Sequence, residues 1–114
     1  MPRRNVGRRG AYRDKERVRC LYRAGIEPGE RIVIRQSFSF ISNREGAFAA
    51  ASELKRLGWT DLRMVEEISG DGFWHVLAGR RQRLSERIVA ENRATAERIA
   101  RQNLGTYDGW SARG

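Results

Sequence analysis

The sequence predicts a single α+β domain, in which helical and extended segments alternate along the chain. Three observations favour this class. Apolar and polar residues alternate from residue 31 to 41, apolar residues recur at helical spacing in three other segments, and Gly70-Asp71-Gly72 separates two short extended patterns. At 114 residues the chain is long enough for one hydrophobic core and too short for two.

The N-terminal segment predicts a basic arm followed by a short helix. Residues 1–11 carry four arginines and no apolar periodicity, so we expect a disordered basic arm. From residue 12 to 24, Val18 and Tyr22 recur at helical spacing, and Gly25 is a candidate C-cap. Residues 12–114 are therefore expected to form one folded domain.

A strand and a second helix are predicted next. Between residues 31 and 41 the even-numbered residues are apolar apart from Gln36, which indicates a strand with one buried face. Ser42 followed three residues later by Glu45 matches a capping box. The apolar face of residues 47–57 then predicts a helix.

Two short strands and a long helix complete the pattern. Residues 61–68 and 73–79 predict a β-hairpin, and residues 84–104 predict a helix with a thin apolar stripe. Gly105 is placed to end that helix, so that residues 107–110 can return as an edge strand. This order predicts a ferredoxin-like βαββαβ sandwich with an additional N-terminal helix.

Two large aromatic residues flank an Asp-Gly pair near the C-terminus, in the sequence Tyr107-Asp108-Gly109-Trp110. Leaving two such rings in water is unfavourable, so we expect this segment to be docked onto the fold. Asp108 is expected to organise a turn, Gly109 to adopt a positive φ, and Trp110 to be a packing residue.

The formal net charge of +9 points to acidic or phosphate-bearing partners, and 21 of the 23 basic residues are Arg. Phe38 and Phe40 share the apolar face of their strand, so core packing explains them better than base stacking. Any RNA contact is therefore expected to be weak and non-specific. The candidate contacts to phosphates or to an acidic partner are Arg8, Arg9, Arg80, Arg81, Arg83 and Arg87. The alternative is that these side chains are only solvated surface.

The sequence argues against an enzyme, because no set of residues combines a nucleophile or base with an orienting partner. His75 is the only histidine and Cys20 the only cysteine, and no spacing resembles a metal loop or a phosphate loop. We therefore expect no cofactor, no metal and no small-molecule ligand. No apolar run approaches the roughly 18 residues of a membrane span, and no secretory leader is recognisable, so a cytoplasmic protein without a membrane partner is expected.

The chain resembles the RraB family, the regulators of ribonuclease activity B, which are protein inhibitors of ribonuclease E. The resemblance covers about residues 12–112. It is carried by Gly25, the turn Glu27-Pro28-Gly29, the helix of residues 47–57 closing on Gly58-Trp59, the long helix and Tyr107-Asp108-Gly109-Trp110.

The resemblance implies a non-catalytic regulatory domain that binds another protein, such as a ribonuclease. The best-known members are strongly acidic and end in an acidic tail, whereas this chain is basic and stops at Gly114. The alternative that composition leaves open is a basic RNA-associated accessory domain, which would bind phosphates non-specifically.

Overall fold

The structure is a computed structural model that describes the backbone of residues 2–67 and 72–113. The side chains of residues 2–9, 11 and 12 are not described. Three helices and four strands follow one another as α1 (Pro2–Arg23), β1 (Arg31–Ile41), α2 (Arg44–Arg56), β2 (Asp61–Glu66), β3 (Phe73–Arg83), α3 (Glu86–Gln102) and β4 (Thr106–Arg113).

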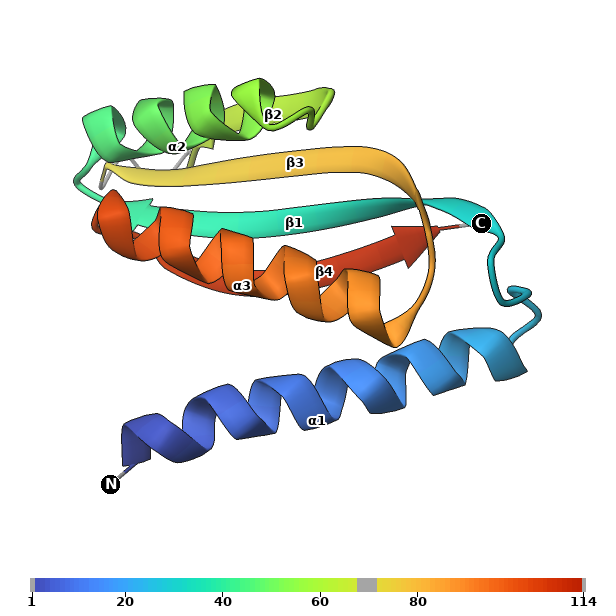
Figure 1. Ribbon diagram of the computed structural model, residues 1–114. Coiled ribbons are helices and arrows are strands. Elements are labelled where there is room, and N and C mark those ends of the chain that lie inside the picture. The colour runs from blue at the N-terminus through green and yellow to red at the C-terminus, as the bar shows by residue number, and fades with distance from the viewer. Residues whose placement is uncertain (1, 68–71, 114) are drawn as a thin grey trace.

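The strands form one antiparallel sheet in the order β2-β3-β1-β4. Helices α2 and α3 lie along the same side of this sheet, and α1 runs beside α3 (Figure 1). The predicted α+β class is therefore confirmed. We call the side without helices the open face, because no helix of the described part of the chain covers it.

The core lies between the sheet and the helices, and it consists of two clusters. One joins Phe38 and Phe40 of β1 to α2, β3 and the C-terminal half of α3. The other joins α1 to the first residues of β1, to the start of α3 and to β4. The buried apolar members of this second cluster are Val18, Ile32, Ile34, Leu84, Val89 and Trp110.

Several predicted boundaries require correction. The backbone of α1 is helical from Pro2, so the segment predicted as a disordered arm is part of a helix. Strand β3 continues to Arg83, because alternation between the two faces persists beyond the last apolar residue. Helix α2 is capped by Asn43, whose side chain accepts a hydrogen bond from the Gly46 amide, and not by Ser42.

The predicted turn at residues 70–72 is only partly described, and the predicted end of α3 at Gly105 requires correction. Gly70 and Asp71 of the predicted hairpin turn lie outside the described residues, and so does the end of the strand predicted to reach residue 68. At the end of α3, Leu104 adopts the positive φ of 56° that was expected of a glycine. Gly105 has a different role, because a Cβ atom there would overlap the ring of the buried Phe40.

We predict that Gly105→Ala destabilises the fold by about 1–3 kcal/mol, since the added methyl group must displace the Phe40 ring from a filled core. The control is Leu104→Gly, which removes an exposed side chain from a positive-φ position and should leave stability unchanged or higher. Urea unfolding measures both. Equal stability of Gly105→Ala and the parent protein would contradict this packing.

Candidate functional site

A β-bulge in β4 determines how the Tyr107-Asp108-Gly109-Trp110 segment is presented. Ser37 of β1 lies opposite Gly109 and Phe38 lies opposite Tyr107, so Asp108 is an extra residue in the ladder. Gly109 has a φ of 119°, as expected, but the Asp-Gly pair lies within a strand and does not form the predicted turn. The bulge places Tyr107 and Trp110, three residues apart, on the same side of the sheet.

The buried carboxylate of Asp14 joins Trp110 to two helices. The indole Nε1 of Trp110 donates to Asp14 Oδ1 at 2.8 Å, and Arg93 of α3 donates to both carboxylate oxygens, at 2.5 and 3.0 Å. The hydrogen bonds to Asp14 raise the pKa of Arg93. Arg17 of α1 also lies over the Trp110 ring, 5.0 Å from its centroid. This arrangement fixes α1, α3 and β4 relative to one another.

Tyr107 extends the same network to the central strand. Its ring lies 5.1 Å from the Arg93 guanidinium carbon, and its hydroxyl donates to the side-chain oxygen of the buried Gln36. Burial raises the pKa of Tyr107 well above its ordinary value. Gln36, the one polar residue on the apolar side of β1, thus has a hydrogen-bond donor for its buried side-chain oxygen.

Trp110 is therefore part of the interior, and Tyr107 is partly buried beside it. Trp110 is only 4% exposed, and the Tyr107 ring packs against Phe38. In the folded protein neither ring offers a partner a broad contact surface. Asp108 points the other way, since its carboxylate accepts a hydrogen bond from Ser39 on the open face.

A row of polar side chains crosses the open face beside Asp108. The Nδ1 atom of His75 lies 3.5 Å from the Ser39 hydroxyl oxygen, and its Nε2 atom lies 2.7 Å from a carboxylate oxygen of Glu67. The residue types match a nucleophile, a base and an acid. The Ser39 hydroxyl, however, donates to Asp108 and not to His75, so this arrangement does not activate it as a nucleophile.

Four arginines gather at the end of the open face where β1 begins and where β3 and β4 end. In the sheet register Arg31 lies directly opposite Arg83, and Val33 lies between Arg81 on β3 and Arg113 on β4. All four side chains are exposed. We call this group the arginine cluster; its members are Arg31, Arg81, Arg83 and Arg113.

Only two of the six arginines predicted as contacts belong to this cluster, namely Arg81 and Arg83. The side chains of Arg8 and Arg9 lie outside the described part. Arg80 points to the helix side, 4.4 Å from the Trp59 ring centroid, and donates to the Leu57 carbonyl at 3.0 Å. Burial lowers the pKa of Arg80. Arg87 lies on α3 and pairs with Glu91 at 3.0 Å.

Sequence reasoning missed Arg31 and Arg113 as members of a site. The available signal was the period of two in the strand pattern, which places Arg31 and Val33 on the side opposite the apolar face. The pairing of β1 with both β3 and β4 could not be read from the sequence, and this pairing brings the four arginines together.

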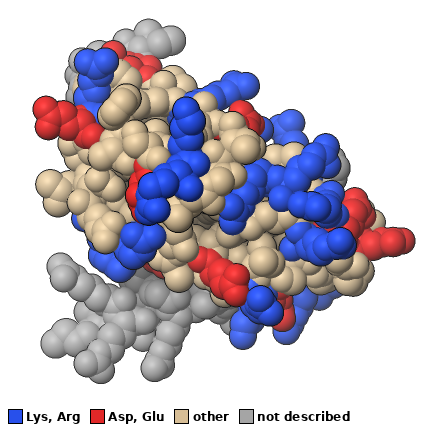
Figure 2. All heavy atoms as spheres, turned by 45° about the horizontal axis from the view of Figure 1, so that its top comes forward, with Lys and Arg blue, Asp and Glu red and all other residues tan. Residues whose placement is uncertain are grey.

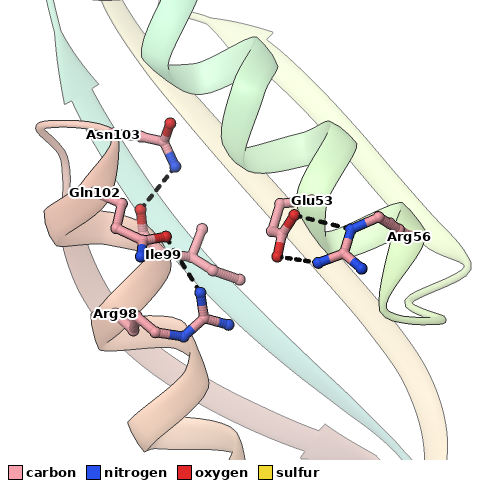
Figure 3. Close-up of polar contacts among 6 residues, drawn as sticks. All are labelled: Glu53, Arg56, Arg98, Ile99, Gln102 and Asn103. Atoms are coloured by element: carbon pink, nitrogen blue, oxygen red, sulfur yellow. Dashed lines mark hydrogen bonds and ion pairs between the residues drawn. The ribbon is translucent and has the colours of Figure 1, made fainter.

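The helix side carries charges of both signs, in contrast to the arginine cluster. Figure 2 shows one face of the molecule, on which Lys and Arg side chains spread over the centre and right with Asp and Glu among them. Figure 3 shows one pair on α2, in which Arg56 donates to both carboxylate oxygens of Glu53, at 3.1 and 2.6 Å. These hydrogen bonds lower the pKa of Glu53. On α3, Arg98 donates to Gln102 at 3.2 Å.

The described residues hold no group of three or more His, Cys, Asp or Glu side chains that could bind a metal ion.

A cavity of about 170 Å³ between α2, β3 and α3 is lined by Leu57, Trp59, Arg80, Asn92, Thr95 and Arg98. None of the helices in the part that the structure describes has the length and apolar character needed to cross a bilayer.

The model of the family described as regulator of ribonuclease activity B matches residues 12–112. Among curated proteins, none matches the chain. The matched range contains every residue of the network around Asp14, and three of the four residues of the arginine cluster.

We predict that Asp14→Ala destabilises the protein by about 3 kcal/mol or more, because it leaves the Arg93 guanidinium and the Trp110 N–H without their buried acceptor. Asp61→Ala is the matched control, since it removes a carboxylate from the exposed pair with Arg35 and should cost less than about 1 kcal/mol. Chemical denaturation gives both values. Similar losses for the two variants would refute a special role for Asp14.

The bulge yields a second prediction. Gly109→Val should cost about 1–3 kcal/mol, because the backbone there has a positive φ that a β-branched residue tolerates poorly. Asp108→Asn should cost less, since an amide oxygen can still accept from Ser39. Thermal melts of both variants test this order, and the reverse order would show that the bulge geometry is wrong.

Proposed function

Because the chain belongs to the RraB family, regulators of ribonuclease activity B, we propose that it regulates a ribonuclease by binding a protein, without catalysing a reaction itself. The family match over residues 12–112 is the observation that carries this proposal. The partner that we propose is a ribonuclease of the ribonuclease E type or a component of its RNA-processing assembly. Such a role places the protein in the cytoplasm, where this partner would act.

The extent of the match supports a domain that folds as a unit from residue 12 onward. The matched range begins just before Asp14 and includes Arg93, Tyr107 and Trp110, the residues that close the fold. We infer that residues 12–114 are the regulatory domain and that residues 1–11 are dispensable for its folding. The strand order β2-β3-β1-β4 also supports our interpretation of the domain as a ferredoxin-like sandwich.

The geometry of the polar row is consistent with a non-catalytic role. Ser39 and His75 are adjacent, but the serine proton is directed to Asp108. Trp110 is buried and Tyr107 is partly buried against Phe38, so both rings support the domain instead of stacking on a ligand. For this function the protein requires no cofactor, metal or small molecule.

The second candidate function is that of an RNA-associated accessory domain, and the arginine cluster is the observation in its favour. Guanidinium groups bind phosphates well. Base stacking, however, needs aromatic faces, and the open face of β1 carries Val33, Arg35, Ser37 and Ser39 at its centre. We therefore rank phosphate contact alone below protein binding.

A titration of ribonuclease activity tests the proposal. With labelled RNA in large excess, we expect added protein to reduce cleavage by the ribonuclease from the same cells until a fixed ratio of protein to enzyme is reached. This ratio should not change when the RNA concentration is raised, because the protein binds the enzyme side of the assembly and not the substrate.

Two outcomes would contradict the proposal. If the protein needed for inhibition rises in proportion to RNA, the protein acts by covering RNA. RNA binding by arginines alone should weaken steeply with salt, with a log-log slope of about −0.7 per phosphate contact on single strands. If labelled RNA instead binds tightly at physiological salt and cleavage never changes at a fixed enzyme ratio, the accessory-domain function replaces ours.

A further inference from the structure

We propose that the arginine cluster of the open face is a docking site for an acidic polypeptide segment of the partner. This inference rests on the proposed function for the partner's identity, and on the sheet register for the site itself. The site comprises Arg31, Arg81, Arg83 and Arg113.

The first step of the argument is electrostatic. Arg31 and Arg83 lie directly opposite each other on neighbouring strands, and like charges at such positions destabilise a sheet. Arg81 and Arg113 flank the same residue, Val33, from the two sides. The isolated domain therefore concentrates repulsion at this end, and a bound anionic chain would relieve it.

The second step of the argument is that the arginine cluster has no carboxylate partner within the described part of the protein. Arg31, Arg81 and Arg113 have no ionic partner among the described residues, and Arg83 donates only to the neutral carbonyl of Gly29, at 2.8 Å. Four arginines on the helices, and Arg35 of β1, differ because they pair with carboxylates. The helical ion pairs are Arg19 with Glu16 and Glu86, Arg56 with Glu53, Arg87 with Glu91, and Arg93 with Asp14.

The third step is spatial. The four guanidinium groups come from three adjacent strands, which span about 10 Å across the sheet at a spacing of about 4.8 Å per strand. Successive rows on one face lie about 7 Å apart along a strand. An extended acidic segment, whose alternate side chains repeat at the same distance, can present carboxylates to both rows at once.

The fourth step favours a polypeptide over RNA. At the end of the open face away from the arginine cluster, two exposed apolar side chains, Ile41 and Val65, lie beside the polar row that contains Ser39 and His75. Ile41 is 67% exposed and Val65 is 46% exposed. A segment with acidic residues followed by apolar ones can use both ends. RNA would find phosphate contacts without aromatic platforms beside them.

We predict that Arg31→Glu weakens binding of an acidic peptide without lowering the stability of the domain. The new carboxylate faces Arg83, so the melting temperature should stay the same or rise. Affinity for a fluorescein-labelled peptide of ten glutamates should fall at least about tenfold, because one anchoring charge is reversed. Arg101→Glu is the matched control: it makes the same change in net charge on the exposed end of α3 and should weaken binding less than about threefold.

Fluorescence anisotropy at physiological salt, with the peptide and with a ten-nucleotide single-stranded RNA, decides the site and its ligand class. Selective loss of peptide binding in Arg31→Glu supports the docking site. Equal losses in Arg31→Glu and Arg101→Glu would overturn it, because net charge alone would then govern binding. Tighter binding of the RNA than of the peptide, lost in Arg31→Glu, would assign the cluster to RNA instead.

The ribonuclease titration separates this inference from the proposed function. If the parent protein inhibits the ribonuclease and Arg31→Glu inhibits it equally well, the docking site is wrong and the proposed function stands. If the parent protein does not inhibit but Arg31→Glu loses peptide binding, the docking site stands and the proposed function fails.

Discussion

The buried carboxylate of Asp14 is the interaction on which the arrangement of this domain depends. A desolvated carboxylate is costly unless donors satisfy it, and here the donors come from two distant elements, Arg93 on α3 and Trp110 on β4. Helix α1 is thereby held against the end of the sheet, where Val18 completes the second core cluster. The other polar contacts of α1 lie at or near the protein surface: the Tyr22 hydroxyl donates to the Leu84 carbonyl at 2.8 Å, and Arg19 lies 3.7 Å from Glu86.

The bulge in β4 links this interior network to the outer surface. It turns both Tyr107 and Trp110 toward the helices while Asp108 remains on the open face. After the bulge the strand resumes its alternation, and Arg113 joins the arginine cluster. One short strand thus closes the core with its aromatic residues and supplies the candidate docking surface with charge. The family motif acts on binding indirectly, by fixing the edge of the sheet that carries Arg113.

The sequence predicted elements well where a single physical signal dominated. Strand β1 was predicted with its observed bounds, because alternation over eleven residues fits no helix. The end of β3 was placed too early, at Gly79, since polar residues mask continued alternation. Arg80 and Arg81 were grouped because they are neighbours in sequence, although adjacent strand residues face opposite sides. Contacts of Asp14 with residues 79 and 96 positions away had no local signal at all.

The central claim is that the motif aromatics face inward while the arginine cluster faces the partner, and NMR mapping of the bound state tests it most directly. We predict that adding the partner's acidic segment to 15N-labelled protein shifts the amide resonances of Arg31, Val33, Arg81 and Arg113. The indole N–H of Trp110 should stay unshifted and protected from hydrogen exchange, because Asp14 holds it in the interior. Shifts confined to α2 and α3, or a Trp110 indole N–H that exchanges rapidly in the free protein, would contradict the claim.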